Sequence, residues 1–236
     1  PAATALIARY GWRQTYLIFG IFSFLVLAVC GLLADRPAAT GAPRPDLGQV
    51  LRTREFRTLY LSILLTSFGL FTFFVYLVPY AESRHIDPFT AASLLAVVGV
   101  FSTLGRLALG PVADRFGRLR TLQMAIFSMA ASYLIWLSEP GYAALAVFAA
   151  IMGAAYGGWV AISPSVLAEL FGTEGLGGTT GALYTGAGIG ALLGPPLAGF
   201  ILDATGSYRP AIAGAMVLEV AALAVILSLR PRTARG

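Results

Sequence analysis

The stretch that decides the fold runs Gly105-Arg106-Leu-Ala-Leu-Gly110-Pro-Val-Ala-Asp114-Arg115-Phe-Gly117-Arg118-Leu-Arg120. It joins the end of a long apolar run to a short turn with one acidic and three basic residues. A basic turn directly after an apolar run is typical of a transmembrane helix that ends on the cytoplasmic side. The run also contains Arg106, and a charge inside a span is costly and usually functional. The stretch therefore predicts a polytopic transporter with an anion contact and an inner gate on one helix.

The composition agrees with a membrane protein. The chain is 58% hydrophobic and 11% charged, with a mean hydropathy of +0.79, whereas soluble domains carry about 25% charged residues. Cys30 and His85 are the only cysteine and histidine, so an intrachain disulfide is excluded and we expect no metal site and no cofactor. The net charge of +5 reflects arginines that flank the apolar runs, and we do not interpret it as nucleic-acid binding.

Seven apolar runs approach or exceed the roughly 20 residues that a helix needs to cross a bilayer. They cover approximately residues 16–33, 59–80, 90–112, 121–137, 143–166, 180–202 and 209–229. A helix satisfies its own backbone in lipid, and the alternating pattern of a membrane barrel is absent from the sequence. The sequence predicts an all-α membrane protein with seven spans.

Arginine sets the predicted orientation, since the chain contains no lysine. Arg106 lies inside a span, four arginines lie in the connections of one side, and the other eleven lie on the opposite side. The four are Arg9, Arg13, Arg84 and Arg209. The arginine-rich side is predicted to be cytoplasmic, which places the N-terminus outside and the C-terminus inside.

Three segments are predicted. Residues 1–34 are interpreted as the truncated end of an N-terminal bundle with its last transmembrane helix. Residues 35–58 contain Pro37, Pro43 and Pro45 and are typical of a cytoplasmic linker. Residues 59–236 form a C-terminal bundle of six helices. The chain is thus expected to be a fragment whose partner is the missing N-terminal half of the same protein.

Three motifs carry a resemblance to the major facilitator superfamily. Residues 110–120 resemble its loop signature G-x-x-x-D-R-x-G-R-[KR], Tyr10-Gly-Trp-Arg13 resembles the entry to its sixth helix, and Gly194-Pro-Pro-Leu-Ala-Gly199 resembles its eleventh helix. With Gly157-Gly-Trp159 and Arg106, the last motif is most similar to the monocarboxylate transporter and oxalate–formate antiporter branches. The resemblance implies two bundles with the substrate between them, and a substrate arginine at Arg106.

The loop signature predicts a gate at the cytoplasmic end. A glycine allows close helix approach, an aspartate can cap the next helix, and arginines can pair with a carboxylate in one state and release it in the other. The alternative is that these arginines only set topology. The predicted gating residues are Gly110, Asp114, Arg115, Gly117, Arg118 and Glu169.

Arg106 is the main candidate for substrate binding. Ser102 and Gly99 lie one and two turns before it, so its face is small and polar and suits a bundle interior. A guanidinium binds a carboxylate in bidentate fashion. The alternative is that Arg106 extends to the inner membrane surface. On the first interpretation, Arg106 and Ser102 contact the substrate.

Weaker candidates are aromatic. Tyr76, Tyr156, Trp159 and Tyr184 either line a cavity or pack helices, whereas Tyr80 ends its run and is expected in the interfacial belt. Glu219 lies near the middle of the last run, with either a direct or a structural role. The glycines between residues 186 and 194, with Gly153 and Gly157, are expected to form helix-packing faces.

The predicted function is secondary transport of a small organic anion, a monocarboxylate in particular, by alternating access with protons as a candidate coupling ion. The setting is a lipid bilayer, the bacterial inner membrane. A drug exporter of the same superfamily is the main alternative. A seven-helix receptor is disfavoured by the loop signature, and an enzyme lacks a nucleophile–base or metal constellation.

Overall fold

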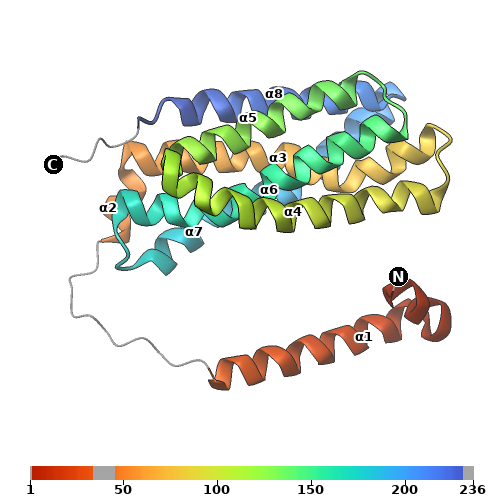
Figure 1. Cartoon of the computed structure of the whole chain (residues 1–236), viewed down its shortest axis with the longest axis horizontal. Coiled ribbons are helices and arrows are strands. Elements are labelled where there is room, and N and C mark those ends of the chain that lie inside the picture. The colour runs from red at the N-terminus through yellow and green to blue at the C-terminus, as the bar shows by residue number, and fades with distance from the viewer. Residues whose placement is uncertain (1, 34–45, 231–236) are drawn as a thin grey trace. The chain divides into compact units, whose positions relative to one another are not determined.

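The structure is a computed structural model that describes residues 2–33 and 46–230. In these residues it contains eight helices: α1 (Ala2–Leu33), α2 (Leu47–Arg52), α3 (Arg54–Ser83), α4 (Pro88–Phe116), α5 (Arg118–Leu137), α6 (Tyr142–Phe171), α7 (Leu176–Thr205) and α8 (Tyr208–Leu227). Seven of these helices are long, and each coincides with one of the seven predicted apolar runs, although α8 ends two residues before its run does (Figure 1). The all-α prediction is therefore confirmed.

The chain divides into two compact units, residues 1–42 and 43–236. In the first unit, α1 is interrupted at Gly11, whose φ of 75° lies in the left-handed region. The hydroxyl of Thr15 donates a hydrogen bond of 2.9 Å to the Gly11 carbonyl and closes the turn after this break. The segment Arg9–Leu32, which includes this break, is long and apolar enough to span a membrane.

The second unit is a bundle made by α2 to α8. Short polar side chains begin several of its helices, as expected for N-caps. Thr53 accepts from the Phe56 amide and Asp87 accepts from the amides of Phe89 and Thr90. Gly117, with φ 94°, separates α4 from α5 and confirms the predicted tight turn. Chain direction places the α4–α5 turn at one end of the bundle, here called the inner end, and the α3–α4 and α7–α8 connections at the other, the outer end.

Helix α3 packs mainly against α7 and α8, while α6 packs against α4 and α5. Large side chains fill the core at the outer half of the bundle. Phe73, Tyr133, Trp136 and Phe148 are completely buried; Tyr133 stacks on Trp136, and the other ring contacts among them are edge-on or tilted. Such aromatic pairs add specific geometry to apolar burial. α5 and α8 are also in contact, so α3, α5, α6 and α8 enclose this aromatic core.

Glycines set the closest helix contacts. A side chain at Gly153 would lie 2.6 Å from the Val98 carbonyl oxygen, and one at Gly194 would lie 2.8 Å from that of Phe68. Side chains at Gly157 and Gly190 would likewise overlap Ser102 and Ser67. The packing role predicted for these glycines is confirmed, because only a residue without Cβ allows such approach. Gly188 differs, since nothing in the described residues lies within 4 Å of its added Cβ.

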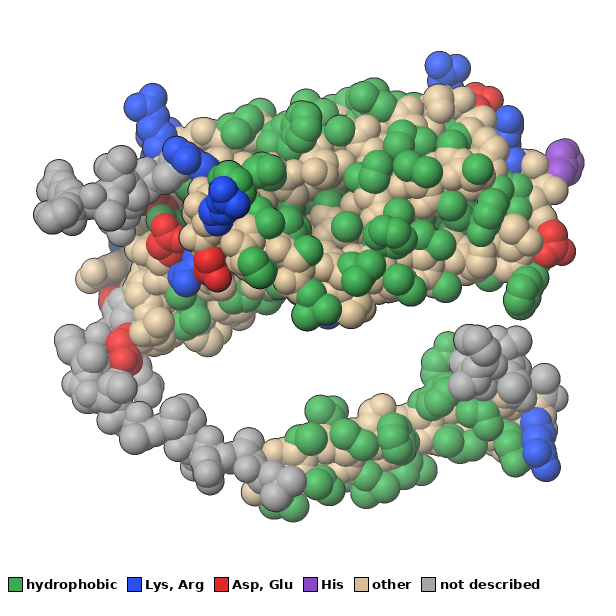
Figure 2. Space-filling view, in the orientation of Figure 1, with side chains coloured by type: hydrophobic (Ala, Val, Ile, Leu, Met, Phe, Trp, Pro, Cys, Tyr) green, Lys and Arg blue, Asp and Glu red, His purple; other side chains and the backbone are tan. Residues whose placement is uncertain are grey.

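By length and composition, six of the described helices could cross a membrane: α1 from Arg9, α3, α4, α6, α7 and α8. The seventh long helix, α5, is not among them. Its polar residues Gln123, Ser128 and Ser132 lower its hydropathy, and Gln123 bonds the Ile226 carbonyl of α8. Figure 2 shows charged side chains at the two ends of the bundle and apolar ones along its length.

The segment predicted as a linker, residues 35–58, contains structure that its proline content did not indicate. It includes the short α2, capped by Asp46, and the first turn of α3 from Arg54. Val50 of α2 is buried against the bundle. Residues 34–45, which hold the three prolines, lie outside the described residues. The boundaries of the predicted linker therefore stay a prediction.

Candidate functional site

Arg106 lies beside the contact between α4 and α6. Four α4 residues form that contact: Val98, Ser102, Gly105 and Leu109 each meet a residue of α6 at a glycine or alanine. At about 100° per residue, Arg106 is roughly 70° around the helix from the centre of this stripe. Its side chain is exposed among the described residues, and its predicted place in a bundle interior stays a prediction. It lies on the edge of the contact rather than within it.

The two flanks of this stripe differ chemically. On one flank, Phe101, Leu104 and Ala108 line an apolar groove of about 420 Å³ together with residues of α5 and α6. Arg106 is on the other flank, where Gly99 and Thr103 are also exposed. A small, polar flank that carries a charge suits contact with water or protein better than contact with lipid. Among the described residues, Arg106 has no ion-pair partner.

Ser102 is not exposed on the flank of α4 that carries Arg106. Its side chain is 7% exposed, and its backbone lies directly against Gly157 of α6. The spacing of four residues placed both on one helix face, but the close α4–α6 contact covers the serine and leaves the arginine free. Ser102 is therefore a packing residue in this structure.

Two of the aromatic candidates form one cluster on α6. The rings of Tyr156 and Trp159 are stacked with centroids 6.5 Å apart, and Tyr156 meets Phe74 of α3 edge-on at 5.3 Å. Tyr156 and Tyr184 are half-buried, while Trp159 is buried. The Trp159 indole nitrogen has no hydrogen-bond partner in the described part of the chain. Phe74 could not be identified from the sequence, because nothing distinguishes it from its aromatic neighbours in α3.

Tyr76 serves helix packing. Its hydroxyl donates to the Pro195 carbonyl of α7 at 3.1 Å, and its ring meets Tyr208 edge-on. An added Cβ at Gly199 would lie 2.6 Å from the same hydroxyl. The hydrogen bond thus joins α3 to α7 at its proline pair, and Gly199 provides the space. Tyr76 therefore packs helices in this structure, and its predicted contact with a substrate stays a prediction.

The residues predicted to form the gate do not make the predicted contacts with one another in this structure. Gly110 has no described atom within 4 Å of an added Cβ, so it does not form the close helix contact expected of it; Gly105 does. No side chain caps the start of α5, so Asp114 does not accept the bonds proposed for it. Arg115 instead stacks on Phe116, with 5.5 Å between the guanidinium carbon and the ring centroid.

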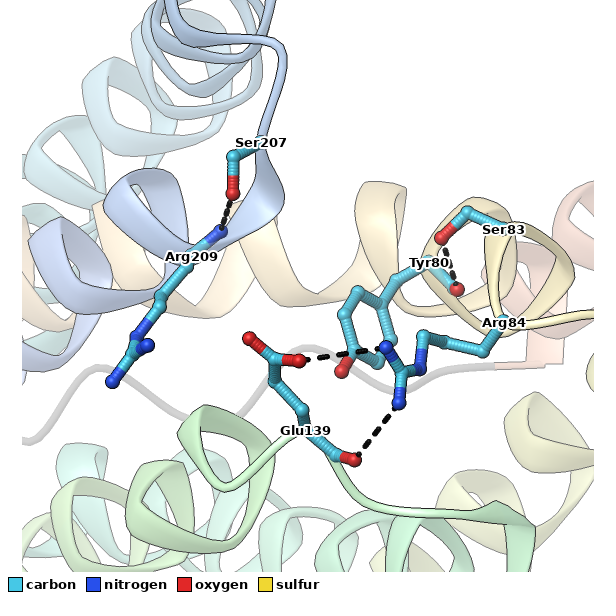
Figure 3. Close-up of polar contacts among 6 residues, drawn as sticks. All are labelled: Tyr80, Ser83, Arg84, Glu139, Ser207 and Arg209. Carbon is cyan, nitrogen blue, oxygen red and sulfur yellow. Dashed lines mark hydrogen bonds and ion pairs between the residues drawn. The ribbon is translucent and has the colours of Figure 1, made fainter.

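Arg118 and Glu169 lie at the same end of the bundle, since α5 begins there and α6 ends there. Both are exposed and they form no ion pair in this structure. The one ion pair among the described residues joins Arg84 and Glu139 at the outer end, at 3.4 Å (Figure 3). Sequence reasoning missed it, because Arg84 and Glu139 are 55 positions apart in two different connections.

Glu219 and Tyr80 are more buried than their sequence positions suggest. Glu219 of α8 is 0% exposed and lies against Gly69 of α3. Tyr80, expected in an interfacial belt, is 4% exposed and packs edge-on against Trp136 and Tyr208. His85 is exposed in the outer connection after α3, with a positive φ of 62°. No group of three metal-ligating side chains occurs within residues 2–33 and 46–230.

Comparison with known proteins covers the whole chain. Residues 1–139 and 59–236 match the family profile described as Major Facilitator Superfamily. Rat monocarboxylate transporter 12 is 29% identical over 253 residues, which are 89% of this chain and 52% of that protein. Human monocarboxylate transporter 11 is 30% identical over 238 residues, or 93% and 50% of the two chains. The MFS transporter asaE of Aspergillus flavus is 29% identical over 222 residues, 90% and 50%. The chain spans about half the length of these relatives.

Solved structures show the same fold. A crystal structure of the E. coli fucose:proton symporter FucP superimposes with a TM-score of 0.72 at 18% identity, covering 97% of this chain and 59% of that one. A second FucP structure, in the outward conformation, gives 0.70 at 21% identity, with 94% and 55% covered. At these identities the likeness concerns the fold alone.

Proposed function

Because the chain belongs to the major facilitator superfamily, we propose that it supplies the C-terminal bundle of a secondary transporter for a small organic anion, a monocarboxylate in particular. The single observation that carries the substrate class is Arg106. It is a charged side chain in the middle part of a membrane helix, exposed on a flank of small and polar residues and without an ion-pair partner in the described residues. Intramembrane arginines of this kind face a cavity or a partner.

The position of Arg106 in its helix supports the proposal. It is ten residues before the end of α4 at Phe116, which is about 15 Å along the helix axis. Charged residues begin earlier, at Asp114 and Arg115, eight and nine residues after Arg106, and the alternative of a side chain that snorkels to the inner surface is tested below. The planar fork of a guanidinium matches the two oxygens of a carboxylate. The monocarboxylate transporters among the relatives favour the same substrate class.

A second bundle is part of the proposal. In transporters of this architecture the substrate lies between repeated bundles, and the two rock against each other. Residues 1–34 would end the N-terminal bundle, and residues 35–58 would lead into the C-terminal one. Arg115 and Arg118 with Glu169 would form an inner gate that is closed in another state. Coupling to protons and a location in the bacterial inner membrane complete the proposed function.

The test is substrate binding to wild type, Arg106→Lys and Arg106→Ala in the two-bundle protein, with labelled small carboxylates as probes. We expect Arg106→Ala to lose about 2–5 kcal/mol of binding free energy, as for one member of a desolvated charge pair. Arg106→Lys should recover little, because an ammonium lacks the planar fork. Arg120→Ala, which removes an exposed arginine at the inner end, is the matched control and should bind normally. Near wild-type affinity in both Arg106 variants would refute the organic-anion assignment.

A further inference from the structure

A second polar pocket, of about 280 Å³, lies at the outer end of the bundle, apart from Arg106. The end of α3, the α5–α6 connection and the start of α8 form its walls. Figure 3 shows Arg84 and Arg209 with Glu139 between them in this view, and the Tyr80 ring between Arg84 and Glu139. Trp136 and Ser207 also line the pocket.

Two buried donors of this pocket lack hydrogen-bond partners in the described residues. They are the Tyr80 hydroxyl and the Trp136 indole nitrogen, from side chains that are 4% and 0% exposed. A buried polar group without a partner is destabilising and usually indicates an absent water, ion or ligand. The indole N–H can only donate. An acceptor placed in this pocket would satisfy the hydroxyl and the indole N–H.

The charge of the pocket points the same way. Arg84 is paired with Glu139, through a 3.4 Å contact to its carboxylate and another of 3.4 Å to its backbone carbonyl. Arg209, exposed at the start of α8, has no ion-pair partner among the described residues. Two guanidinium groups and one carboxylate leave one positive charge at the pocket. A ligand with one negative charge and several acceptor oxygens would neutralise it.

The connection that holds Glu139 is strained. Glu139 has a φ of 54°, which is uncommon outside glycine, and its amide bonds the Trp136 carbonyl at 3.2 Å. Backbone strain of this kind occurs at ligand clamps. Here it brings the carboxylate of Glu139 to Arg84 and leaves Arg209 available on the other side of the pocket.

We propose that this outer pocket, lined by Tyr80, Arg84, Trp136 and Arg209, binds a singly charged oxyanion. The anion would accept from the Tyr80 hydroxyl, the Trp136 indole and the Arg209 guanidinium, while Glu139 keeps Arg84 in place. The same chemistry fits a free carboxylate and the phosphodiester of a lipid headgroup, since the pocket lies at the outer end of membrane helices. The proposal does not depend on Arg106 or on its substrate.

The first arm of the test uses the chain in detergent, with sodium acetate replacing sodium chloride at constant ionic strength. Trp136 is the reporter, and we expect a saturable change in tryptophan fluorescence that disappears in Trp136→Phe. Arg209→Gln should weaken acetate binding by about tenfold or more, and Tyr80→Phe by several-fold, as for charge-assisted and neutral hydrogen bonds. Arg120→Gln removes the same charge at the inner end and should leave the affinity unchanged. A signal retained in Trp136→Phe would come from elsewhere and would count against the pocket.

The second arm measures lipid retention. Native mass spectrometry of the chain taken from phosphatidylglycerol nanodiscs should show fewer retained lipids in Arg209→Gln than in Arg120→Gln if the oxyanion is a headgroup. Without acetate or phosphatidylglycerol, Tyr80→Phe should unfold at the wild-type temperature or above, because it removes an unsatisfied hydroxyl; this checks folding. An acetate response identifies a free anion, and lipid loss alone identifies a headgroup. If neither effect is observed, the proposal is overturned, and the pocket is an interfacial aromatic cluster only.

Discussion

Glu219 presents the sharpest question at the scale of single residues. Its carboxyl group is completely buried, 3.3 Å from the position that a Gly69 side chain would take, and no cation pairs with it in the described part of the chain. An unpaired charge buried among helices is costly. We therefore assign Glu219 a structural role that does not need the charge.

Two substitutions test this structural role of Glu219. Glu219→Gln keeps the shape and the polar group, and should keep the thermal unfolding temperature and substrate binding. Glu219→Ala should lower the stability by about 2 kcal/mol or more, because it leaves a cavity. Both are measured by thermal unfolding in detergent. If Glu219 took part directly in transport, the glutamine variant would lose uptake while remaining as stable as wild type.

Residue identities were easier to predict than residue partners. The sequence singled out Arg106 as a charge within an apolar run, because hydropathy alone reveals it. It could not place Ser102, since the closeness of α4 and α6 depends on glycines of both helices. Tyr76 and the pair Arg84–Glu139 have partners more than 50 positions away, and no local pattern encodes such contacts.

At the scale of elements, the close contact between α4 and α6 depends on glycines, which have no side chain. A Cβ at Gly157 would overlap the Ser102 backbone, while nothing described lies within 4 Å of one at Gly214 in α8. We expect Gly157→Ala to destabilise the bundle by about 1–3 kcal/mol through overpacking. Gly214→Ala should be neutral or stabilising by up to about 1 kcal/mol, because alanine is the better helix former. The measurement is the thermal unfolding of both variants. Equal changes in stability for Gly157→Ala and Gly214→Ala would contradict the close α4–α6 contact.

Helices were predictable as elements because lipid demands long apolar runs. Each helix nevertheless extends beyond its run at one end or both, as α3 does from 59–80 to Arg54–Ser83, since polar caps and turns add residues that hydropathy does not register. The short α2 lies in the segment that was predicted as a linker. The packing order, with α3 against α7 and α8 and α4 against α6, was beyond the sequence, because several arrangements of six apolar helices bury similar areas.

At the scale of the whole molecule, α4 and α7 are less covered than their neighbours. Only 22% of the apolar window of each is buried, against 50% in α3 and 56% in α6. Their exposed faces include Gly99, Thr103 and Arg106 on α4 and Gly181 and Thr185 on α7. Small and polar residues are enriched where membrane helices meet other helices or water. These are the faces against which the proposed second bundle would pack.

The last prediction follows from the proposed division into two bundles. The chain reconstituted alone in liposomes should insert, which flotation and protease protection will show, but should not take up labelled carboxylates saturably. One wall of the pathway would be missing, and Arg106 would face lipid or water instead of a closed cavity. Adding the N-terminal bundle as a separate chain should restore uptake, and Arg106→Ala should abolish the restored uptake. Saturable uptake by the chain alone that depends on Arg106 would refute the two-bundle pathway while leaving the role of the arginine intact.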